Sequence, residues 1–410
     1  MIRGNSKDRI SVSRSLMESS TNLVSINASL RLITLLLFLL PPVLGSATTA
    51  CYSSIFSFGD SLADTGNLVH TLGRDGIRIG RPPYGMTYFH RPTGRFFDGR
   101  LIADFIAQEM GLPLLPPYLE ETMGGDMRKG VNFAVGGATA MENGFFRNRG
   151  IHIKFTNVSL GDQIQWFKQF LPSLCSSSSA CEDMLHESLV LMGAIGGNDY
   201  NDPFMEGRSL REIKSFVPRV VSTISSAIDE LIELGARTLL VPGITPLGCN
   251  SAYLTYYRTH QAEDYDSTTG CLKWLNEFSM YHNGLLQAEL QRLQQLHPHA
   301  TIIYADYYGA SMSIFSNPNA FGFGEEPLVA CCGGGGPYNY NFSRQCGSEG
   351  STVCGDPSRY VHWDGLHMTE ATYRSIAIGL LHGPFAAPAI GSKCPNIQLS
   401  LHGDVEVAEG

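Results

Sequence analysis

Short runs of hydrophobic residues recur along the chain and are separated by amphipathic segments. Within each run the hydrophobic residues are continuous rather than alternating, which is typical of strands buried on both faces of a parallel sheet. Five such runs predict five strands: SSIFSF (53–58), GVNFAV (130–135), SLVLMGAI (188–195), ARTLLVP (236–242) and ATIIYAD (300–306).

Two helices are predicted between the last three strands, because hydrophobic residues recur there at steps of three and four. The first extends from Ile213 to Leu231 and is followed by Gly235, a residue that often ends helices. The second extends from Leu275 to Leu296. Strands that alternate with helices in this way predict a doubly wound α/β fold.

A block of apolar residues at 32–44 follows Arg31 and precedes the small residues GSATTAC. This pattern predicts a secretory signal within an N-terminal extension, residues 1–50, with cleavage after Ala50 or after Ser46. Met17 is an alternative start. We therefore expect the secretory pathway, with the cell exterior as the default destination and the Golgi or vacuole as alternatives.

The apolar block is shorter than the roughly 20 residues that a membrane-spanning helix needs, and no other uncharged run approaches that length. We expect no stable membrane insertion of the mature chain. Lipid attachment at Cys51 is an alternative, but Thr48 stands where a bulky aliphatic residue would be expected.

No Pro/Ser-rich linker divides residues 51–395, so we predict a single domain, followed by a polar, disordered tail at 396–410. Two loops pinned by cysteines are expected, at the Ser-rich segment 175–181 and the Gly-rich segment 331–346. The formal net charge of −9 argues against a nucleic-acid partner. We expect a monomer.

All ten cysteines lie at or after Cys51. An even number in a chain expected to be exported predicts disulfides, and the absence of Cys-x-x-Cys or His-x-x-x-His spacing argues against a metal site. Proximity along the chain predicts these pairs: Cys175 with Cys181, Cys249 with Cys271, Cys331 and Cys332 with Cys346 and Cys354 in an order left open, and Cys51 with Cys394. Asn157 in NVS and Asn341 in NFS are sequons that predict glycosylation in the same compartment.

Ser61 follows the first predicted strand directly, in Gly-Asp-Ser. In a parallel sheet, functional groups collect at the carboxyl ends of the strands, so Ser61 is a candidate nucleophile beside a helix N-terminal amide. The alternative is a residue that shapes a turn and caps a helix.

Asp364 and His367 are three residues apart just before a predicted helix. This spacing lets the carboxylate orient the imidazole while the other ring nitrogen faces a hydroxyl. The alternative is a capping aspartate beside a surface histidine. His362 is a rival base, but it does not fit the Asp-x-x-His pattern.

Paired glycines end two of the predicted strands, in NFAVGGATA and GAIGGNDY. Backbone without Cβ atoms can approach a ligand closely, so the Gly137 amide and the Asn198 side chain could donate to an oxyanion. Gly-rich turns are common in α/β proteins, and neither stretch has the pattern of a phosphate-binding loop.

Together these segments resemble a plant GDSL esterase/lipase of the SGNH hydrolase superfamily. The resemblance is carried by FGDSLADTGN, GRFFDGRLIADFIAQEMGLP, NFAVGGATA, GGNDY, VPGITPLGCN and DGLHMTEATY, and it extends from residue 55 to about 380. It implies a three-layer α/β/α flavodoxin-like fold with a five-stranded parallel sheet, and a site without metal or cofactor.

The same resemblance implies roles for individual residues. Ser61 would be the nucleophile, His367 its base and Asp364 the residue that orients the base. The Ser61 amide, Gly137 and Asn198 would line the oxyanion hole. Other polar residues of these motifs are expected to shape turns (Asp60, Asp64 and Asn67) or to cap helices (Asp98 and Asp199).

The expected activity is hydrolysis of carboxylic esters through an acyl-enzyme. An acidic, secreted chain without an evident apolar lid favours polar substrates, such as acetylated cell-wall polysaccharide or acylated secondary metabolites, over bulk triacylglycerol. Three alternatives remain open at this stage: an acyltransferase with the same acyl-enzyme, a lipase that acts on lipid esters, and a non-catalytic binding protein.

Overall fold

The computed structural model describes residues 51–120 and 126–390. The predicted signal with its two cleavage sites, the alternative start at Met17, the tail at 396–410 and Cys394 lie outside these residues.

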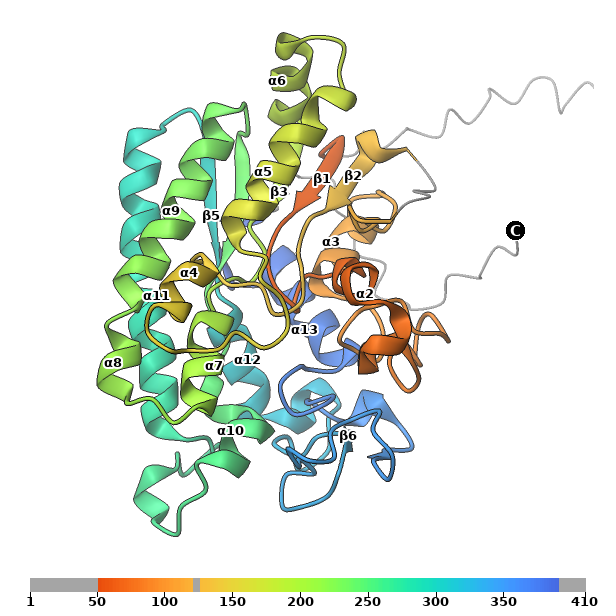
Figure 1. Cartoon of the computed structure of the whole chain (residues 1–410), viewed down its shortest axis with the longest axis vertical. Coiled ribbons are helices and arrows are strands. Elements are labelled where there is room, and N and C mark those ends of the chain that lie inside the picture. The colour runs from red at the N-terminus through yellow and green to blue at the C-terminus, as the bar shows by residue number, and fades with distance from the viewer. Residues whose placement is uncertain (1–50, 121–125, 391–410) are drawn as a thin grey trace, which may run out of the picture. The chain divides into compact units, whose positions relative to one another are not determined.

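A six-stranded sheet forms the centre of the described structure, in the order β2-β1-β3-β4-β5-β8 (Figure 1). Neighbours among the first five strands are parallel, and β8 pairs antiparallel with β5. The five predicted parallel strands are therefore confirmed, and β8 is an addition. The strands are β1 (Ser54–Ser57), β2 (Gly130–Asn132), β3 (Ser188–Leu191), β4 (Thr238–Pro242), β5 (Thr301–Ala305) and β8 (Ala386–Ala387).

Helices cover both faces of this sheet. On one face pack α5 (Leu160–Phe170), α9 (Val217–Glu233) and α11 (Lys273–Leu296). On the other pack α3 (Ile102–Glu109), α12 (Tyr307–Ser316) and α13 (Glu370–Leu381). The result is the predicted three-layer α/β/α architecture, with the strand order 2-1-3-4-5 that defines flavodoxin-like folds.

Shorter elements fill the connections. The α-helices are α2 (Asn67–Leu72), α4 (Asn143–Arg147), α6 (Ser178–His186), α7 (Asn198–Met205), α8 (Leu210–Lys214) and α10 (Ser251–Tyr256). The 3₁₀ turns are η1 (Arg74–Gly76), η2 (Arg78–Gly80), η3 (Met127–Lys129), η4 (Leu171–Ser173), η5 (Leu247–Cys249), η6 (Ala262–Asp264), η7 (Pro318–Phe321) and η8 (Pro357–Arg359). A second sheet pairs β6 (Cys332–Gly333) with β7 (Thr352–Val353).

Two predicted segments differ in the structure. The helix expected over 213–231 is divided into α8 and α9, because Pro218 in the first turn of α9 favours a new helix start. The Ser-rich segment 175–181 is not wholly a loop, since α6 begins within it. Ser177 caps this helix by accepting a hydrogen bond from the Ala180 N–H at 3.2 Å.

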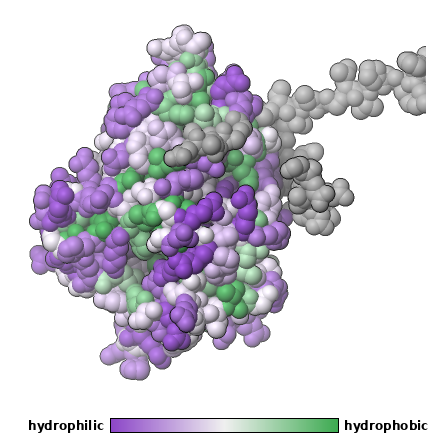
Figure 2. Space-filling model, turned by 45° about the vertical axis from the view of Figure 1, so that its right-hand side comes forward, coloured by the Kyte–Doolittle hydropathy of each residue, from purple (hydrophilic) through white to green (hydrophobic). Residues whose placement is uncertain are grey.

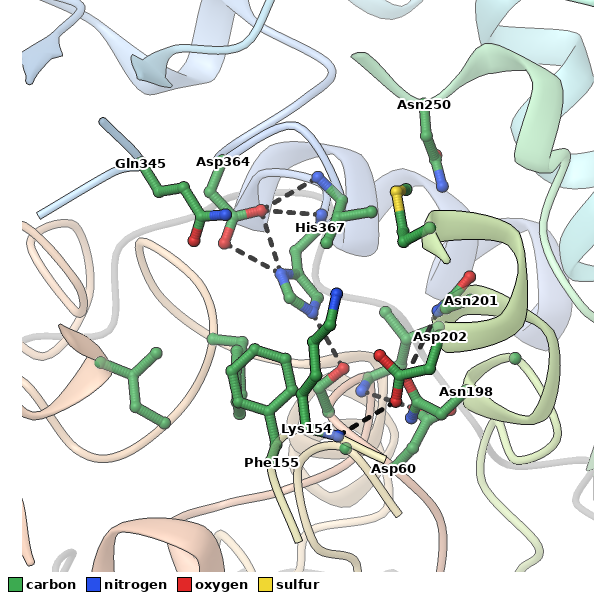
Figure 3. Close-up of a pocket in the computed structure, with 18 of the residues that line it drawn as sticks. Asp60, Lys154, Phe155, Asn198, Asn201, Asp202, Asn250, Gln345, Asp364 and His367 are labelled. Carbon is green, nitrogen blue, oxygen red and sulfur yellow. Dashed lines mark hydrogen bonds and ion pairs between the residues drawn. The ribbon is translucent and has the colours of Figure 1, made fainter. Parts of the chain in front are cut away.

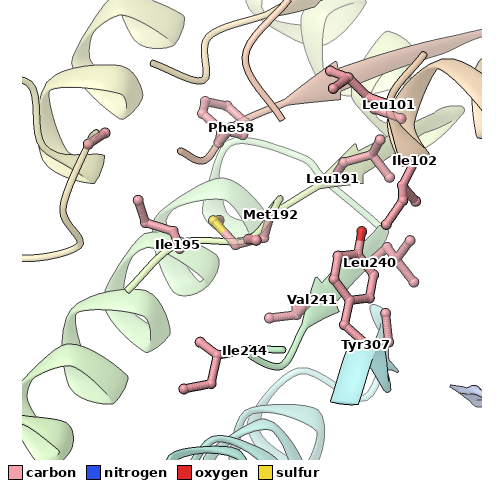
Figure 4. Packing of buried hydrophobic residues seen from close by; sticks show 14 of the residues in the cluster. Phe58, Leu101, Ile102, Leu191, Met192, Ile195, Leu240, Val241, Ile244 and Tyr307 are labelled. Atoms are coloured by element: carbon pink, nitrogen blue, oxygen red, sulfur yellow. The ribbon is translucent and has the colours of Figure 1, made fainter. Parts of the chain in front are cut away.

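Buried side chains alternate between the two faces of the central strands (Figure 4). Leu191 and Leu240 lie with Ile102 and Tyr307 on one side, and Val241 points to the other. All five side chains are buried, and burying a large apolar side chain contributes about 1.5–3 kcal/mol relative to exposure. This burial on both faces explains why the strand sequences are continuously hydrophobic.

Disulfides follow the predicted pattern wherever both cysteines are described. Cys175 is bonded to Cys181 and Cys249 to Cys271. The order left open by the sequence is Cys331–Cys354 and Cys332–Cys346. These last two bonds pin the Gly-rich segment between residues 331 and 354 (the double-disulfide loop). The predicted Cys51–Cys394 bond involves Cys394, which lies outside the described residues.

On the face seen in Figure 2, hydrophilic residues predominate and hydrophobic residues occur in small groups. Large hydrophobic side chains that are exposed, such as Leu72 and Phe321, are usual at this frequency on globular proteins. Within residues 51–120 and 126–390, no helix combines the length and the hydrophobicity that crossing a membrane requires.

The start of α13 is fixed by side chains from the segment that precedes α3. Asp98 Oδ1 accepts a hydrogen bond from the Glu370 N–H at 2.8 Å, so Asp98 does cap a helix, but one far along the chain. Arg100 forms an ion pair with the Glu370 carboxylate at 2.7 Å. Burial raises the pKa of Asp98 to about 7, and the negative charge of Glu370 adds to this rise.

This raised pKa predicts a pH-dependent stability. The folded chain holds a proton on Asp98 up to about pH 7, whereas the unfolded chain releases it near pH 4. The free energy of unfolding should therefore fall, through this group, as pH rises from about 4 to about 7. Asp98→Asn keeps the acceptor oxygen and removes the charge, so its melting temperature relative to wild type should rise between pH 5 and pH 8.

Asp126→Asn is the matched control. Asp126 is exposed, and its hydrogen bonds with Arg128 lower its pKa, so its removal should not stabilise the chain at higher pH. If the difference in melting temperature between Asp98→Asn and wild type stays constant across pH, the raised pKa of Asp98 is wrong.

Candidate active site

Ser61 lies in a tight turn four residues beyond β1, at the carboxyl edge of the sheet. The turn packs closely on the segment after β3: the Asp60 N–H donates to the Ala194 carbonyl at 2.9 Å. A Cβ on Gly59 would lie only 2.9 Å from the same carbonyl oxygen, and Gly59 has φ = 138°, so this position favours glycine. The helix expected near Ser61 is α2, which begins at Asn67, beyond the turn that carries Ser61.

Hydrogen bonds align the side chains of Ser61, His367 and Asp364. Figure 3 shows the His367 ring beside the Asp364 carboxylate in the pocket. Ser61 Oγ lies 2.9 Å from His367 Nε2. On the other side of the ring, His367 Nδ1 lies 2.9 Å from Asp364 Oδ2 and 3.0 Å from Oδ1. The imidazole is packed by Phe96 and Phe97, whose ring centroids lie 5.0 and 5.3 Å from its own. The structure thus brings Ser61 into contact with His367, although the two residues are 306 positions apart in the sequence.

The Asp364 carboxylate is held in its charged form. Burial alone would raise its pKa, but the charge of His367 and the hydrogen bonds from His367 and from the Leu366 and His367 amides lower it overall. A buried anion beside Nδ1 fixes the tautomer that leaves Nε2 as the acceptor for a hydroxyl proton.

Asp60, the neighbour of Ser61, is a second buried acid at this site. Its Oδ1 accepts a hydrogen bond from the Leu62 N–H at 2.9 Å, so it shapes the turn as expected. Burial raises its pKa to about 7, although the Leu62 amide and the charge of His367 oppose the rise.

His362, the rival base, lies apart from Ser61. It is fully buried, its Nε2 lies 2.9 Å from the Cys249 carbonyl, and its ring packs on Phe315. Burial lowers its pKa to about 4, so it stays neutral near pH 7. Neither of its ring nitrogens is bonded to Ser61, and the structure therefore assigns the contact with Ser61 to His367.

Three potential donors face one pocket beside Ser61. The backbone N–H groups of Ser61 and Gly137 donate to no acceptor within residues 51–120 and 126–390. Asn198 Nδ2 donates to the Ala138 carbonyl at 2.9 Å, which leaves its second N–H for another acceptor. Gly137 has φ = 81°, and a Cβ there would lie 2.6 Å from the Phe155 side chain, so glycine is required.

Asn198 is itself held in place. The Asn201 side-chain amide donates to Asn198 Oδ1 at 3.3 Å, and Asn201 in turn accepts a hydrogen bond from the Tyr253 hydroxyl at 2.5 Å. These bonds fix which way the Asn198 amide points. Asp199 differs from expectation: its carboxylate binds the Ala140 and Met141 N–H groups rather than capping a helix. It ties the start of α7 to the loop that follows Gly137.

The pocket has a cavity volume of about 180 Å³ and is lined by several loops. Apolar side chains from η2, the 151–159 segment, α7 and the double-disulfide loop form much of its wall. They include Ile79, Phe155, Met205, Tyr340 and Phe342. Within the described part of the chain, no group of three or more His, Cys, Asp or Glu side chains is arranged to hold a metal ion.

Both predicted glycosylation acceptors are exposed. Asn157 accepts a hydrogen bond from the Asn143 side chain, and Asn341 Oδ1 accepts one from the Ser343 N–H at 2.9 Å. Asn341 lies between Tyr340 and Phe342, two residues of the pocket wall.

Sequence reasoning did not single out Tyr84 or Asn201, although both line the pocket. Tyr84 lies in the loop that precedes α3, and its hydroxyl donates to Asp364 Oδ2 at 3.0 Å. Neither residue belongs to a periodic pattern. The one available signal is that Asn201 follows Asn198 by three residues, a spacing that places both side chains on one helix face.

Comparison with known proteins gives a consistent result. Residues 55–380 match the family described as GDSL-like lipase/acylhydrolase. A GDSL esterase/lipase of Arabidopsis thaliana is 56% identical over 344 residues, covering 84% of this chain and 87% of its own. A second from the same organism is 54% identical over 352 residues, covering 85% and 90%. The sinapine esterase of Brassica napus is 49% identical over 361 residues, covering 86% and 91%.

Fold, site and relatives together define a carboxylic ester hydrolase. The chain belongs to the GDSL-like lipase/acylhydrolase family. The predicted family resemblance and the predicted fold are confirmed.

The geometry around Asn198 predicts the effect of one substitution. Asn198→Ala removes a side-chain donor but leaves the fold intact, so we expect turnover to fall about 10²–10³-fold, the usual effect of losing one oxyanion donor. Turnover and melting temperature should be measured together. Asn319→Ala, an exposed asparagine outside the pocket, is the control. Turnover close to wild type in Asn198→Ala would remove Asn198 from the reaction.

Proposed function

We propose that the chain hydrolyses carboxylic esters through a covalent acyl-enzyme on Ser61. The observation that carries this proposal is the line from Ser61 Oγ to His367 Nε2 and from His367 Nδ1 to Asp364, with all heavy-atom distances between 2.9 and 3.0 Å. A hydroxyl, a base and an acid that orients the base are the parts that activate a serine.

Ser61 Oγ attacks the ester carbonyl carbon while its proton passes to His367 Nε2. The carbonyl oxygen gains negative charge and accepts hydrogen bonds from the Ser61 and Gly137 N–H groups and from Asn198 Nδ2. His367 then gives its proton to the departing alkoxide, which leaves as an alcohol. In the second half, His367 takes a proton from water, the hydroxide attacks the acyl carbon, and the acid departs as the proton returns to Ser61.

For the substrate we propose polar acyl or acetyl esters, such as acylated secondary metabolites or acetylated cell-wall polysaccharide. The relative from Brassica napus is named for sinapine, which favours a small acylated metabolite. The pocket supports a substrate with polar groups, because Asn201, Asn250 and Gln345 line it together with its apolar wall.

We also propose that the protein is secreted, glycosylated at Asn157 and Asn341, and monomeric. Four disulfides among the described residues support an oxidising compartment, since such bonds are rare in the cytosol. The exposure of both asparagines supports their modification. Enzymatic removal of N-glycans followed by mass analysis of each sequon tests this part of the proposal.

A substrate panel tests the choice of ester. It should contain short-chain nitrophenyl esters, sinapine and other hydroxycinnamoyl esters, acetyl-xylan and a long-chain triacylglycerol, each with product analysis. We expect the highest kcat/KM on a polar ester. A preference for triacylglycerol would overturn the proposed substrate class, and an acylated alcohol among the products would indicate acyl transfer.

Ser61 and His367 can be tested as one unit. Ser61→Ala, His367→Ala and the double variant should lose about the same activity, because half of a catalytic pair is little better than none. Wild-type activity should also fall at acid pH, since protonated His367 cannot accept the Ser61 proton. If Ser61 only shapes the turn, Ser61→Ala would lower stability by about 1 kcal/mol and keep its turnover. If the activity lost in the double variant equals the product of the two single losses, Ser61 and His367 act independently and the shared unit is wrong.

A further inference from the structure

Among the described residues, Tyr84 is the one side chain outside Ser61, His367 and Asp364 that donates a hydrogen bond to the Asp364 carboxylate. The distance from its hydroxyl oxygen to Asp364 Oδ2 is 3.0 Å. Its side chain is 3% exposed, and its ring meets the edge of Trp363 at a centroid distance of 6.0 Å. Within the described residues this hydroxyl makes no second hydrogen bond, so its proton is directed at the Asp364 carboxylate.

We propose that Tyr84 is a positioning residue for the reaction, which holds the Asp364 carboxylate against His367 and shares its negative charge. This inference rests on the proposed function of Ser61, His367 and Asp364. It adds a fourth side chain to that unit, one that acts through Asp364 without touching the reacting atoms.

The hydrogen bonds of Asp364 show what Tyr84 contributes. Oδ1 accepts from the Leu366 and His367 N–H groups, at 3.1 and 2.9 Å, and these come from the same turn as Asp364. Both oxygens face His367 Nδ1, Oδ1 at 3.0 Å and Oδ2 at 2.9 Å, and Oδ2 also accepts from Tyr84. Tyr84 therefore anchors the carboxylate that faces His367 to a different part of the chain.

The proton of Tyr84 is available across the working range of pH. Burial and the adjacent charge of Asp364 raise its pKa well above the usual range, so the phenol remains a donor. Other titratable or charged groups near Tyr84, Asp364 or His367 are Asp60, Arg78, Tyr340, His362 and Tyr373, and Lys154 lines the same pocket.

The loop that carries Tyr84 is braced against the segment that packs on His367. The Gly85 N–H donates to the Phe97 carbonyl at 2.8 Å, and the Arg91 N–H donates to the Gly85 carbonyl at 3.2 Å. Gly85 has φ = 74°, and a Cβ there would lie 2.1 Å from the Arg91 carbonyl oxygen. The bond between Gly85 and Phe97 therefore links two contacts of the site. It joins the segment that places Tyr84 beside Asp364 to the segment whose Phe96 and Phe97 rings pack on the His367 imidazole.

Tyr84→Phe removes the hydroxyl and keeps the ring. Loss of one hydrogen bond to a charged group should lower kcat/KM about tenfold. The carboxylate left behind carries more of its charge on the oxygen beside Nδ1 and stabilises the imidazolium more strongly. The acid limb of the profile of kcat/KM against pH should therefore move to higher pH, a change that a purely structural loss would not produce.

Tyr88→Phe is the matched control, because Tyr88 lies in the same loop, is 42% exposed and bonds to Gln108 instead of Asp364. Its acid limb should coincide with that of wild type. Melting temperatures identify any loss of folding, and labelling of Ser61 with a fluorophosphonate reports the proposed function separately. If wild type is labelled and hydrolyses esters while Tyr84→Phe has an unchanged acid limb and rate, the positioning role is wrong. If wild type is not labelled, the proposed function itself fails.

Discussion

Four backbone N–H groups converge on the buried carboxylate of Asp64, and the candidate site is built around this convergence. Three of them follow Ser61 in the chain, and the fourth comes from the loop that contains Gly137. The donors are Gly66 at 2.7 Å, Asn67 at 2.6 Å, Leu68 at 3.1 Å and Gly136 at 2.7 Å. Burial raises the pKa of Asp64, and these bonds oppose the rise by offsetting the loss of water around the charge. One side chain thereby fixes the separation between the turn with Ser61 and the loop with Gly137.

Much of this architecture could be predicted because its signals are local. Continuous hydrophobic runs require burial on both faces, and parallel strands bring their carboxyl ends to one edge, so Ser61, Gly137 and Asn198 had to lie near one another. The Asp-x-x-His spacing likewise limits Asp364 and His367 to a single turn. That pattern also favoured His367 over His362 as the base, and the structure places the two differently: His362 is enclosed by the core, whereas His367 opens onto the pocket.

The features that escaped prediction depend on contacts between distant segments. Asn67 was expected to shape a turn, yet its side chain binds the Asn132 and Ala134 carbonyls and the Leu119 N–H. Asp199 was expected to cap a helix and instead binds a loop that precedes it by 58 residues. Strand β8 is two alanines long and has no periodic pattern to reveal it. In each case the contact joins segments that are distant in the sequence, so no local pattern of residues indicates it.

The double-disulfide loop contributes Tyr340, Phe342, Gln345 and Cys346 to the pocket, yet its regular structure amounts to the two-residue strands β6 and β7. Much of its hydrogen bonding comes from turns, such as the bonds from the Gly335 N–H to Asn339 Oδ1 at 3.0 Å and from the Ser348 N–H to the Gln345 carbonyl at 3.0 Å. Its shape depends on the bonds Cys331–Cys354 and Cys332–Cys346, which are made by oxidation after the backbone is synthesised. The two sides of the site are thus held by different means: packing and hydrogen bonds align Ser61 with His367 at the sheet edge, whereas two covalent bonds cross-link the loop that faces them. Reduction of these two bonds would therefore loosen one wall of the pocket while the sheet edge that carries Ser61 keeps its own packing.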